Sequence, residues 1–126
     1  MSEIHILLVD DNEDDRFLAS RMLRKLPVPV RLEIARDGVE ALDQLQGGDT
    51  ATLPSLVILD LQLPRMNGAE VLEQLRATPE TRDIPVVVVS ASGHPLDLER
   101  CRKLGANAYL TKPLDVGQLN QVIAGL

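Results

Sequence analysis

Short apolar runs recur along the chain, and they constrain its fold more than any other feature. Most of the runs contain almost only aliphatic residues, whereas the second alternates loosely with polar residues, and all are too far apart to be joined as hairpins. They are Ile4–Val9, Val28–Ala35, Leu56–Leu59, Val86–Val89 and Ala106–Leu110. Uninterrupted aliphatic runs of this length are typical of strands buried on both faces, which occur in parallel sheets.

Segments with helical periodicity separate the apolar runs. They cover Asp14–Leu26, a stretch that begins at Asp37, Met66–Ala77, Leu96–Leu104, and a C-terminal stretch with Leu119, Val122, Ile123 and Leu126 on one face. Asp37 and Glu40 have the spacing of a helix-start signature, and Gly105 is placed to end the fourth helix. Five strands alternating with five helices predict an α/β fold, a (βα)5 doubly wound parallel sheet, in one domain covering residues 1–126.

Composition and charge exclude several classes of protein. The formal net charge of −6 argues against a nucleic-acid binder, which needs a basic face. A single cysteine, Cys101, excludes an internal disulfide framework. The N-terminus lacks the pattern of a signal peptide, and no apolar run approaches the ~20 residues that span a bilayer. We therefore expect a cytoplasmic protein without a membrane segment.

Polar residues follow four of the predicted strands. Asp10 and Asp11 come after the first run, Asp60 after the third, Ser90 after the fourth, and Lys112 shortly after the fifth. The carboxyl ends of parallel strands share one edge of the sheet, which is where such sheets bind ligands. Each residue alone has an ordinary structural explanation, such as a turn, a helix cap or a surface lysine. Their joint occurrence at the strand ends predicts a site.

The residue types at this edge favour phosphoryl chemistry on a carboxylate. Two carboxylates ~4 Å apart repel each other by about 4 kcal/mol at an effective dielectric constant near 20, so the cluster needs a cation. Oxygen ligands select a hard ion, Mg²⁺ or Mn²⁺, rather than zinc. The metal and a lysine neutralise the oxygens of a phosphoryl group while a carboxylate attacks phosphorus and forms an aspartyl phosphate.

The motifs at this edge resemble those of a known family. Leu7–Asp11, Leu59–Gly68, Val89–Ala91 and Gly105–Pro113 together look like the receiver domain of two-component response regulators. The resemblance covers essentially the whole chain and implies a flavodoxin-like fold with strand order 2-1-3-4-5, as in a stand-alone, chemotaxis-type regulator without an effector domain. Val9–Arg16 and Leu61–Pro64 are also similar to regulators that partner bacterial phytochromes.

The resemblance assigns a role to each site residue. Asp60 is expected to be the phosphoacceptor, taking phosphate from a phosphohistidine of a sensor histidine kinase. Asp11, Asp60 and the backbone carbonyl of Gln62 are expected to bind Mg²⁺ directly, and Asp10 through a water. Ser90 and Lys112 are expected to bind the phosphoryl group.

The resemblance also implies a switch and its partners. Tyr109 is expected to turn inward when Ser90 moves, and the Lys112–Pro113 peptide bond is expected to be cis. Kinase docking is expected on the first predicted helix, at Arg16, Phe17 and Ser20. The signal then passes to a protein target or a phosphotransfer protein. Such domains often dimerise through the face formed by the fourth helix, fifth strand and fifth helix.

Four alternatives compete with this signalling switch, whose only chemistry is its own phosphorylation and dephosphorylation at Asp60. A haloacid-dehalogenase-like phosphatase usually has a second Asp two residues after the nucleophile, where this chain has Gln62. A flavodoxin-like electron carrier would need a phosphate loop and aromatic residues around the flavin. The chain has no Gly-x-x-x-x-Gly-Lys-Ser/Thr loop of a nucleotide hydrolase. The complete set of site residues argues against a receiver that is not phosphorylated.

Overall fold

Strands and helices alternate along the part of the chain that the structure describes. A computed structural model describes residues 3–46, 53–63, 66–91, 95–112 and 114–125. Within these residues the elements are β1 (Ile4–Val9), α1 (Glu13–Arg24), β2 (Val30–Ala35), α2 (Gly38–Gln46), β3 (Leu56–Asp60), α3 (Gly68–Ala77), β4 (Val86–Ser90), α4 (Pro95–Lys103), β5 (Ala108–Thr111) and α5 (Val116–Ala124). The predicted (βα)5 alternation is confirmed.

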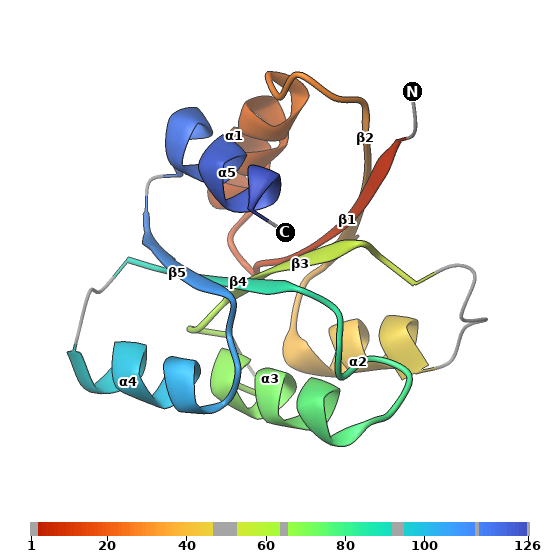
Figure 1. Ribbon diagram of the computed structural model, residues 1–126, viewed down its shortest axis with the longest axis vertical. Helices are drawn as coiled ribbons and strands as arrows, with labels where there is room; N and C mark the ends of the chain where they lie inside the picture. The colour runs from red at the N-terminus through yellow and green to blue at the C-terminus, as the bar shows by residue number, and fades with distance from the viewer. Residues whose placement is uncertain (1–2, 47–52, 64–65, 92–94, 113, 126) are drawn as a thin grey trace.

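The five strands form one parallel sheet in the order β2-β1-β3-β4-β5. This is the order 2-1-3-4-5 that the resemblance implied. Strand β2 lies on one side of β1, and β3 lies on the other side. The direction in which strands are added to the sheet therefore reverses between β1 and β3 (Figure 1). A crevice at the carboxyl ends of the strands is expected at this switch point.

Alternate residues of β1, β3, β4 and β5 pack into two separate cores. Leu7, Val57 and Val88 belong to the core on the side of α2, α3 and α4. Leu8 and Ile58 belong to the core on the side of α1 and α5. Figure 1 shows the two helical layers on opposite faces of the sheet. Burial on both faces explains why these strands are continuous aliphatic runs rather than alternating ones.

Helix α3 begins two residues later than its apolar pattern predicted. The pattern indicated a start at Met66, whereas the helix begins at Gly68 because Asn67 caps it. The Asn67 Oδ1 atom accepts a hydrogen bond from the Glu70 backbone N–H at 3.0 Å. Polar caps of this kind satisfy backbone donors that a helix leaves unpaired at its start. The predicted cap at Asp37 is confirmed, since Asp37 Oδ1 accepts a 2.8 Å hydrogen bond from Glu40 N–H.

The last strand is also shifted from its prediction. The apolar run predicts a start at Ala106, but β5 begins at Ala108, and the preceding residues make a turn. Gly105 has a φ of +94°, a left-handed conformation that favours glycine, and it ends α4 as predicted. Asn107 then uses its Oδ1 atom to accept a 2.9 Å hydrogen bond from the Val86 N–H.

A single arginine ties together the amino ends of β4 and β5. Arg76, in the last turn of α3, donates to the carbonyl oxygens of Gly105, Arg82 and Ile84 at distances between 2.8 and 3.2 Å. It also donates to Asn107 Oδ1 at 3.2 Å. These contacts satisfy carbonyls of two loops with one planar donor group. We call this arrangement the Arg76 clamp.

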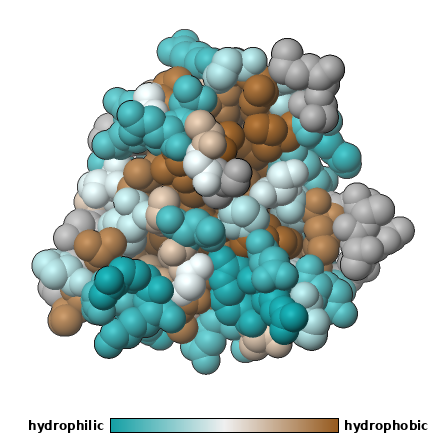
Figure 2. All heavy atoms as spheres, in the orientation of Figure 1, coloured by the Kyte–Doolittle hydropathy of each residue, from teal (hydrophilic) through white to brown (hydrophobic). Residues whose placement is uncertain are grey.

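None of the helices in the described part of the chain is both long enough and apolar enough to cross a membrane. The surface in Figure 2 is mixed, with hydrophilic side chains over much of α3 and α4 and apolar side chains gathered beside α1 and α5, toward β1 and β2.

Candidate functional site

The sheet brings the predicted site residues to one edge. Asp60 and Ser90 are the last residues of β3 and β4, while Asp10 and Lys112 directly follow β1 and β5. The Lys112 N–H continues the strand pairing by donating to the Ser90 carbonyl at 2.8 Å. Residues from four separate parts of the sequence therefore lie together at the carboxyl ends of the strands, as the sequence predicted.

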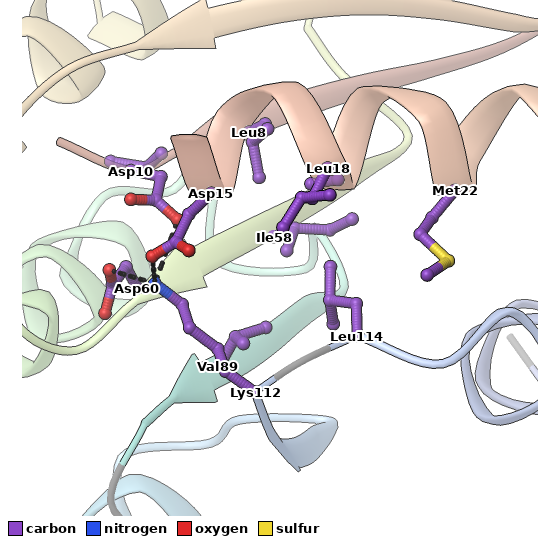
Figure 3. Close-up of a pocket in the computed structure, with 12 residues that line it drawn as sticks. Leu8, Asp10, Asp15, Leu18, Met22, Ile58, Asp60, Val89, Lys112 and Leu114 are labelled. Carbon is purple, nitrogen blue, oxygen red and sulfur yellow. Dashed lines mark hydrogen bonds and ion pairs between the residues drawn. The ribbon is translucent and has the colours of Figure 1, made fainter. Parts of the chain in front are cut away.

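The ammonium group of Lys112 is the centre of this cluster. Its Nζ atom donates hydrogen bonds to Asp60 Oδ2 at 2.9 Å, Asp10 Oδ2 at 3.1 Å and Asp15 Oδ2 at 2.8 Å (Figure 3). Lysine carries three N–H donors, so each has a carboxylate acceptor. The side chains of Asp10 and Asp60 are nearly buried, being 5% and 6% exposed. Lys112 compensates for burying their charge.

Asp15 is a member of the cluster that the sequence did not predict. It lies in the first turn of α1, where an acidic residue is ordinary because it interacts favourably with the helix dipole. Asn12 sets its position, since Asn12 Oδ1 accepts a 2.9 Å hydrogen bond from the Asp15 N–H. The only signal in the sequence is its position five residues after Asp10, in the segment that follows β1.

Burial and hydrogen bonding act in opposite directions on the pKa values of two groups, and both values are raised. Burial raises the pKa of the Asp10 carboxyl above its ordinary value, against the hydrogen bonds from Asn12 N–H and Lys112. Burial alone would lower the pKa of the Lys112 ammonium, but the hydrogen bonds to Asp15, Asp60 and Asp10 outweigh it and raise that pKa. The Lys112 side chain is therefore a fixed positive charge at this edge.

Three carboxylates at the edge fit a divalent cation. Asp10, Asp11 and Asp60 each offer an oxygen, and these atoms all lie within 4.8 Å of one another. Asp10 and Asp60 are buried and Asp11 is exposed, so the cluster opens to solvent on one side. Oxygen donors with this charge suit Mg²⁺ or Mn²⁺ better than softer ions. Gln62 turns its N–H toward Asp60 Oδ1 at 3.0 Å, and the role of its carbonyl stays a prediction.

The loop after Asp60 depends on Gly68. A Cβ atom there would lie 2.4 Å from the Asp60 carbonyl oxygen and 2.7 Å from Leu61 Cα. The Gly68 N–H donates to the Leu61 carbonyl at 2.9 Å, which ties the start of α3 to the end of β3. Only glycine allows this close approach, and it fixes the backbone that carries Asp60.

The predicted switch residues lie on neighbouring strands. Tyr109 is paired with Val88 and Thr111 with Ser90, so Tyr109 and Ser90 belong to the same face of the sheet. Ser90 is buried, while Tyr109 is half-buried and packs against the core on the side of α2, α3 and α4. Their movement stays a prediction. The predicted cis bond lies outside the described residues, because Pro113 is not among them.

The residues predicted to dock a kinase differ in their surroundings. Phe17 is 61% exposed on α1, and the Arg21 guanidinium lies 5.8 Å from the centre of its ring. Arg16 instead supports the site, because its Nη1 atom donates to the Asp10 carbonyl at 3.1 Å. Ser20 is half-buried on the same helix.

A mostly apolar cavity of about 150 Å³ leads away from the cluster beneath α1. Asp15 and Lys112 lie at one end of it, and Leu18, Met22 and Leu114 line the remainder (Figure 3). The ion pair between Asp15 and Lys112 joins the start of α1 to the end of β5 across this end of the cavity.

Comparisons with known proteins agree with this geometry. Residues 6–124 match the family model described as the response regulator receiver domain. A curated relative from Methanothrix harundinacea, "Probable methanogenesis regulatory protein FilR2", is 41% identical over 94% of this chain and 77% of its own length. Response regulator Rcp1 from Synechocystis is 35% identical over 96% of this chain and 84% of its own length.

Solved structures show the same fold with the expected kinds of ligand. The Mn²⁺-bound form of Rcp1 superposes with a TM-score of 0.80 at 34% identity, covering 97% of this chain and 90% of that one. The phosphorylated cyanobacterial phytochrome response regulator RcpA superposes with a TM-score of 0.82 at 37% identity, covering 98% of this chain and 91% of that one.

Proposed function

The chain belongs to the response regulator receiver domain family, and on this premise we propose that Asp60 accepts a phosphoryl group from the phosphohistidine of a sensor histidine kinase. Receiver domains of this family are signal transducers in two-component systems, which excludes the phosphatase considered as an alternative. The observation that carries the assignment to Asp60 is its place between a lysine and an acidic cluster. Its Oδ2 atom lies 2.9 Å from Lys112 Nζ, and its Oδ1 atom accepts from the Gln62 N–H.

The phosphoryl transfer uses these contacts directly. A carboxylate oxygen of Asp60 forms a bond to phosphorus, and the bond between phosphorus and the donor imidazole nitrogen breaks. The electron pair of that bond stays on the imidazole nitrogen, which takes up a proton from water. Lys112 donates hydrogen bonds to the phosphoryl oxygens and offsets their charge.

A divalent cation completes the site. Asp11, Asp60 and the Gln62 carbonyl would hold Mg²⁺ directly, and Asp10 through a water. When bound, Mg²⁺ neutralises the carboxylates and the oxygens of the transferred group. The clustered oxygens of Asp10, Asp11 and Asp60 support this assignment, as does the Mn²⁺-bound form of Rcp1.

Phosphorylation then changes the surface through Ser90 and Tyr109. An aspartyl phosphate adds acceptor oxygens that Ser90 and Lys112 can satisfy only by closing in. Space opens beside Ser90, and Tyr109 turns into it from the neighbouring strand. The position of both residues on one face of the sheet supports this coupling. The result is a population shift between two states that differ at α4, β5 and α5.

The partners follow from the exposed surfaces. Phe17 on α1 supports kinase docking beside the site, and a bacterial phytochrome is the kinase favoured by the similarity to RcpA. Leu96 and Leu98 on α4 are 74% and 45% exposed, which supports contact with a protein target, a phosphotransfer protein or a second copy through α4, β5 and α5. We place this exchange in the cytoplasm.

Incubation with the small donor phosphoramidate and Mg²⁺ tests the proposal. Intact-mass measurement should show one phosphoryl group on the wild type and none on Asp60→Asn. Asp43→Asn, which removes the same charge from the exposed face of α2, is the matched control and should be labelled like the wild type. Equal labelling of Asp60→Asn and Asp43→Asn would remove Asp60 as the acceptor.

A further inference from the structure

The ammonium of Lys112 has no spare donor. Its three N–H groups point at carboxylates of Asp10, Asp15 and Asp60, and the contact with Asp15 is the shortest at 2.8 Å. A phosphoryl group on Asp60 also needs Lys112, because its oxygens carry about −1.5 to −2 of charge. Binding of the phosphoryl group therefore requires Lys112 to exchange acceptors.

Asp15 differs from the other two acceptors of Lys112. Asp10 and Asp60 belong to the set whose oxygens converge for a cation, and Asp15 does not. A bound divalent ion would offset the charge of Asp10 and Asp60 and weaken their hold on Lys112. Asp15 would then be the carboxylate that keeps its full charge and holds the ammonium away from a phosphoryl group. Its side chain is also the most open of the three, being 37% exposed, so water can solvate it once it is released.

We infer that Asp15 is a positioning residue that holds Lys112 in the resting state and competes with the phosphoryl group for it. This inference rests on the proposed phosphorylation of Asp60. The carboxylate of Asp15 keeps Lys112 over the site before phosphorylation but opposes the arrival of an anionic donor. Its release frees one N–H of Lys112 for a phosphoryl oxygen and breaks the ion pair that joins the start of α1 to the end of β5.

The competition predicts that removing the charge of Asp15 speeds phosphorylation. With acetyl phosphate as the donor and Mg²⁺ present, Asp15→Asn should raise the ratio of maximal rate to half-saturating donor concentration by roughly two- to fivefold, since one ion pair at a partly exposed site has this order of effect. Most of the change should be a lower half-saturating concentration. Damage to the fold would lower the ratio, so a gain identifies competition.

The neighbouring residue provides the matched control. Asp14 lies in the same first turn of α1, is exposed and is not among the acceptors of Lys112. Asp14→Asn removes the same charge and should change the ratio much less than Asp15→Asn does. Asp15→Glu keeps the charge and should stay near the wild type. Asp15→Ala gives a second test, because it removes the carboxylate without an amide in its place.

Each outcome decides between the claims. Faster labelling of Asp15→Asn and Asp15→Ala than of Asp14→Asn supports the inference. Equal rates in all of these variants, or slower labelling without Asp15, would overturn it while leaving Asp60 as the acceptor. Failure to label the wild type would instead contradict the proposed function.

Discussion

The two edges of the sheet are built on opposite electrostatic principles. At the amino edge, the guanidinium of Arg76 donates to carbonyl oxygens and to Asn107, so one cation satisfies several neutral acceptors. At the carboxyl edge, three carboxylates share the ammonium of Lys112, and Asp11 adds a fourth acidic group beside them. The first edge has matched donors and acceptors, and the second has an excess of negative charge.

This difference separates stability from function. Hydrogen bonds from a charged donor to backbone carbonyls stabilise a fold, and their loss leaves acceptors unsatisfied. Clustered carboxylates destabilise a fold unless a cation offsets them, so their persistence at one edge indicates a binding role. Substitutions at the two edges should therefore move stability in opposite directions.

The largest effect on stability is expected at the Arg76 clamp. Arg76→Ala should lower the free energy of unfolding by about 2 kcal/mol, because three backbone carbonyls lose their charged donor. Urea unfolding followed by circular dichroism measures this change. The rate of phosphorylation of the folded protein should stay at the wild-type value, since the clamp lies at the far edge of the sheet.

Arg82→Ala is the matched control for the clamp. Its side chain is exposed, while the carbonyl that Arg76 binds is backbone and stays in place. Its free energy of unfolding should differ from the wild type by a few tenths of a kcal/mol. If Arg76→Ala and Arg82→Ala lose the same stability, the Arg76 clamp does not stabilise the amino edge, and the contrast between the two edges is wrong.

A smaller and opposite effect is expected at the carboxyl edge. Asp10→Asn should raise the free energy of unfolding of the cation-free protein at pH 7 by about 1 kcal/mol, because it removes a buried charge beside Asp60. The same variant should phosphorylate more slowly and gain less stability from added Mg²⁺. Thermal unfolding with and without Mg²⁺ measures both changes in stability, and a time course of phosphorylation measures the rate. A loss of stability at pH 7 would contradict the account.

The smallest expected effect is the change with pH in the stability difference between Asp10→Asn and the wild type. Burial raises the pKa of Asp10, so the folded state holds this proton more tightly than the unfolded state does. Stability from Asp10 is therefore present at low pH and is lost as the pH rises through the raised pKa. The advantage of Asp10→Asn over the wild type should shrink as the pH falls from 7 toward 4, and an advantage that grows on acidification would have the wrong sign.

The sequence predicted the carboxyl edge far better than the amino edge. Asp10, Asp60, Ser90 and Lys112 follow aliphatic runs, and the rule that parallel strands end at one edge was enough to bring them together. The Arg76 clamp joins α3 to Gly105 across 29 residues through backbone carbonyls, which leave no mark in the side-chain pattern. Contacts of that kind are visible only once the chain is folded.

Local competition explains the smaller differences. The apolar pattern of α3 included Met66, but the cap at Asn67 determines where the helix starts. The run from Ala106 predicts a strand that starts there. Because the Asn107 side chain accepts the hydrogen bond from β4, the strand β5 begins one residue after Asn107, at Ala108. The sequence does not single out Asp15, because an acidic residue in the first turn of a helix has an ordinary explanation, and only the fold shows that Lys112 reaches it.

Identification of the phosphorylated residue tests the central claim most directly. Four carboxylates lie together at the carboxyl edge, so labelling alone does not tell them apart. Borohydride reduces an aspartyl phosphate to homoserine, and peptide mass spectrometry then locates the reduced residue. After treatment with phosphoramidate and Mg²⁺, homoserine should be found at position 60 alone. Reduction at Asp10, Asp11 or Asp15, with Asp60 intact, would contradict it.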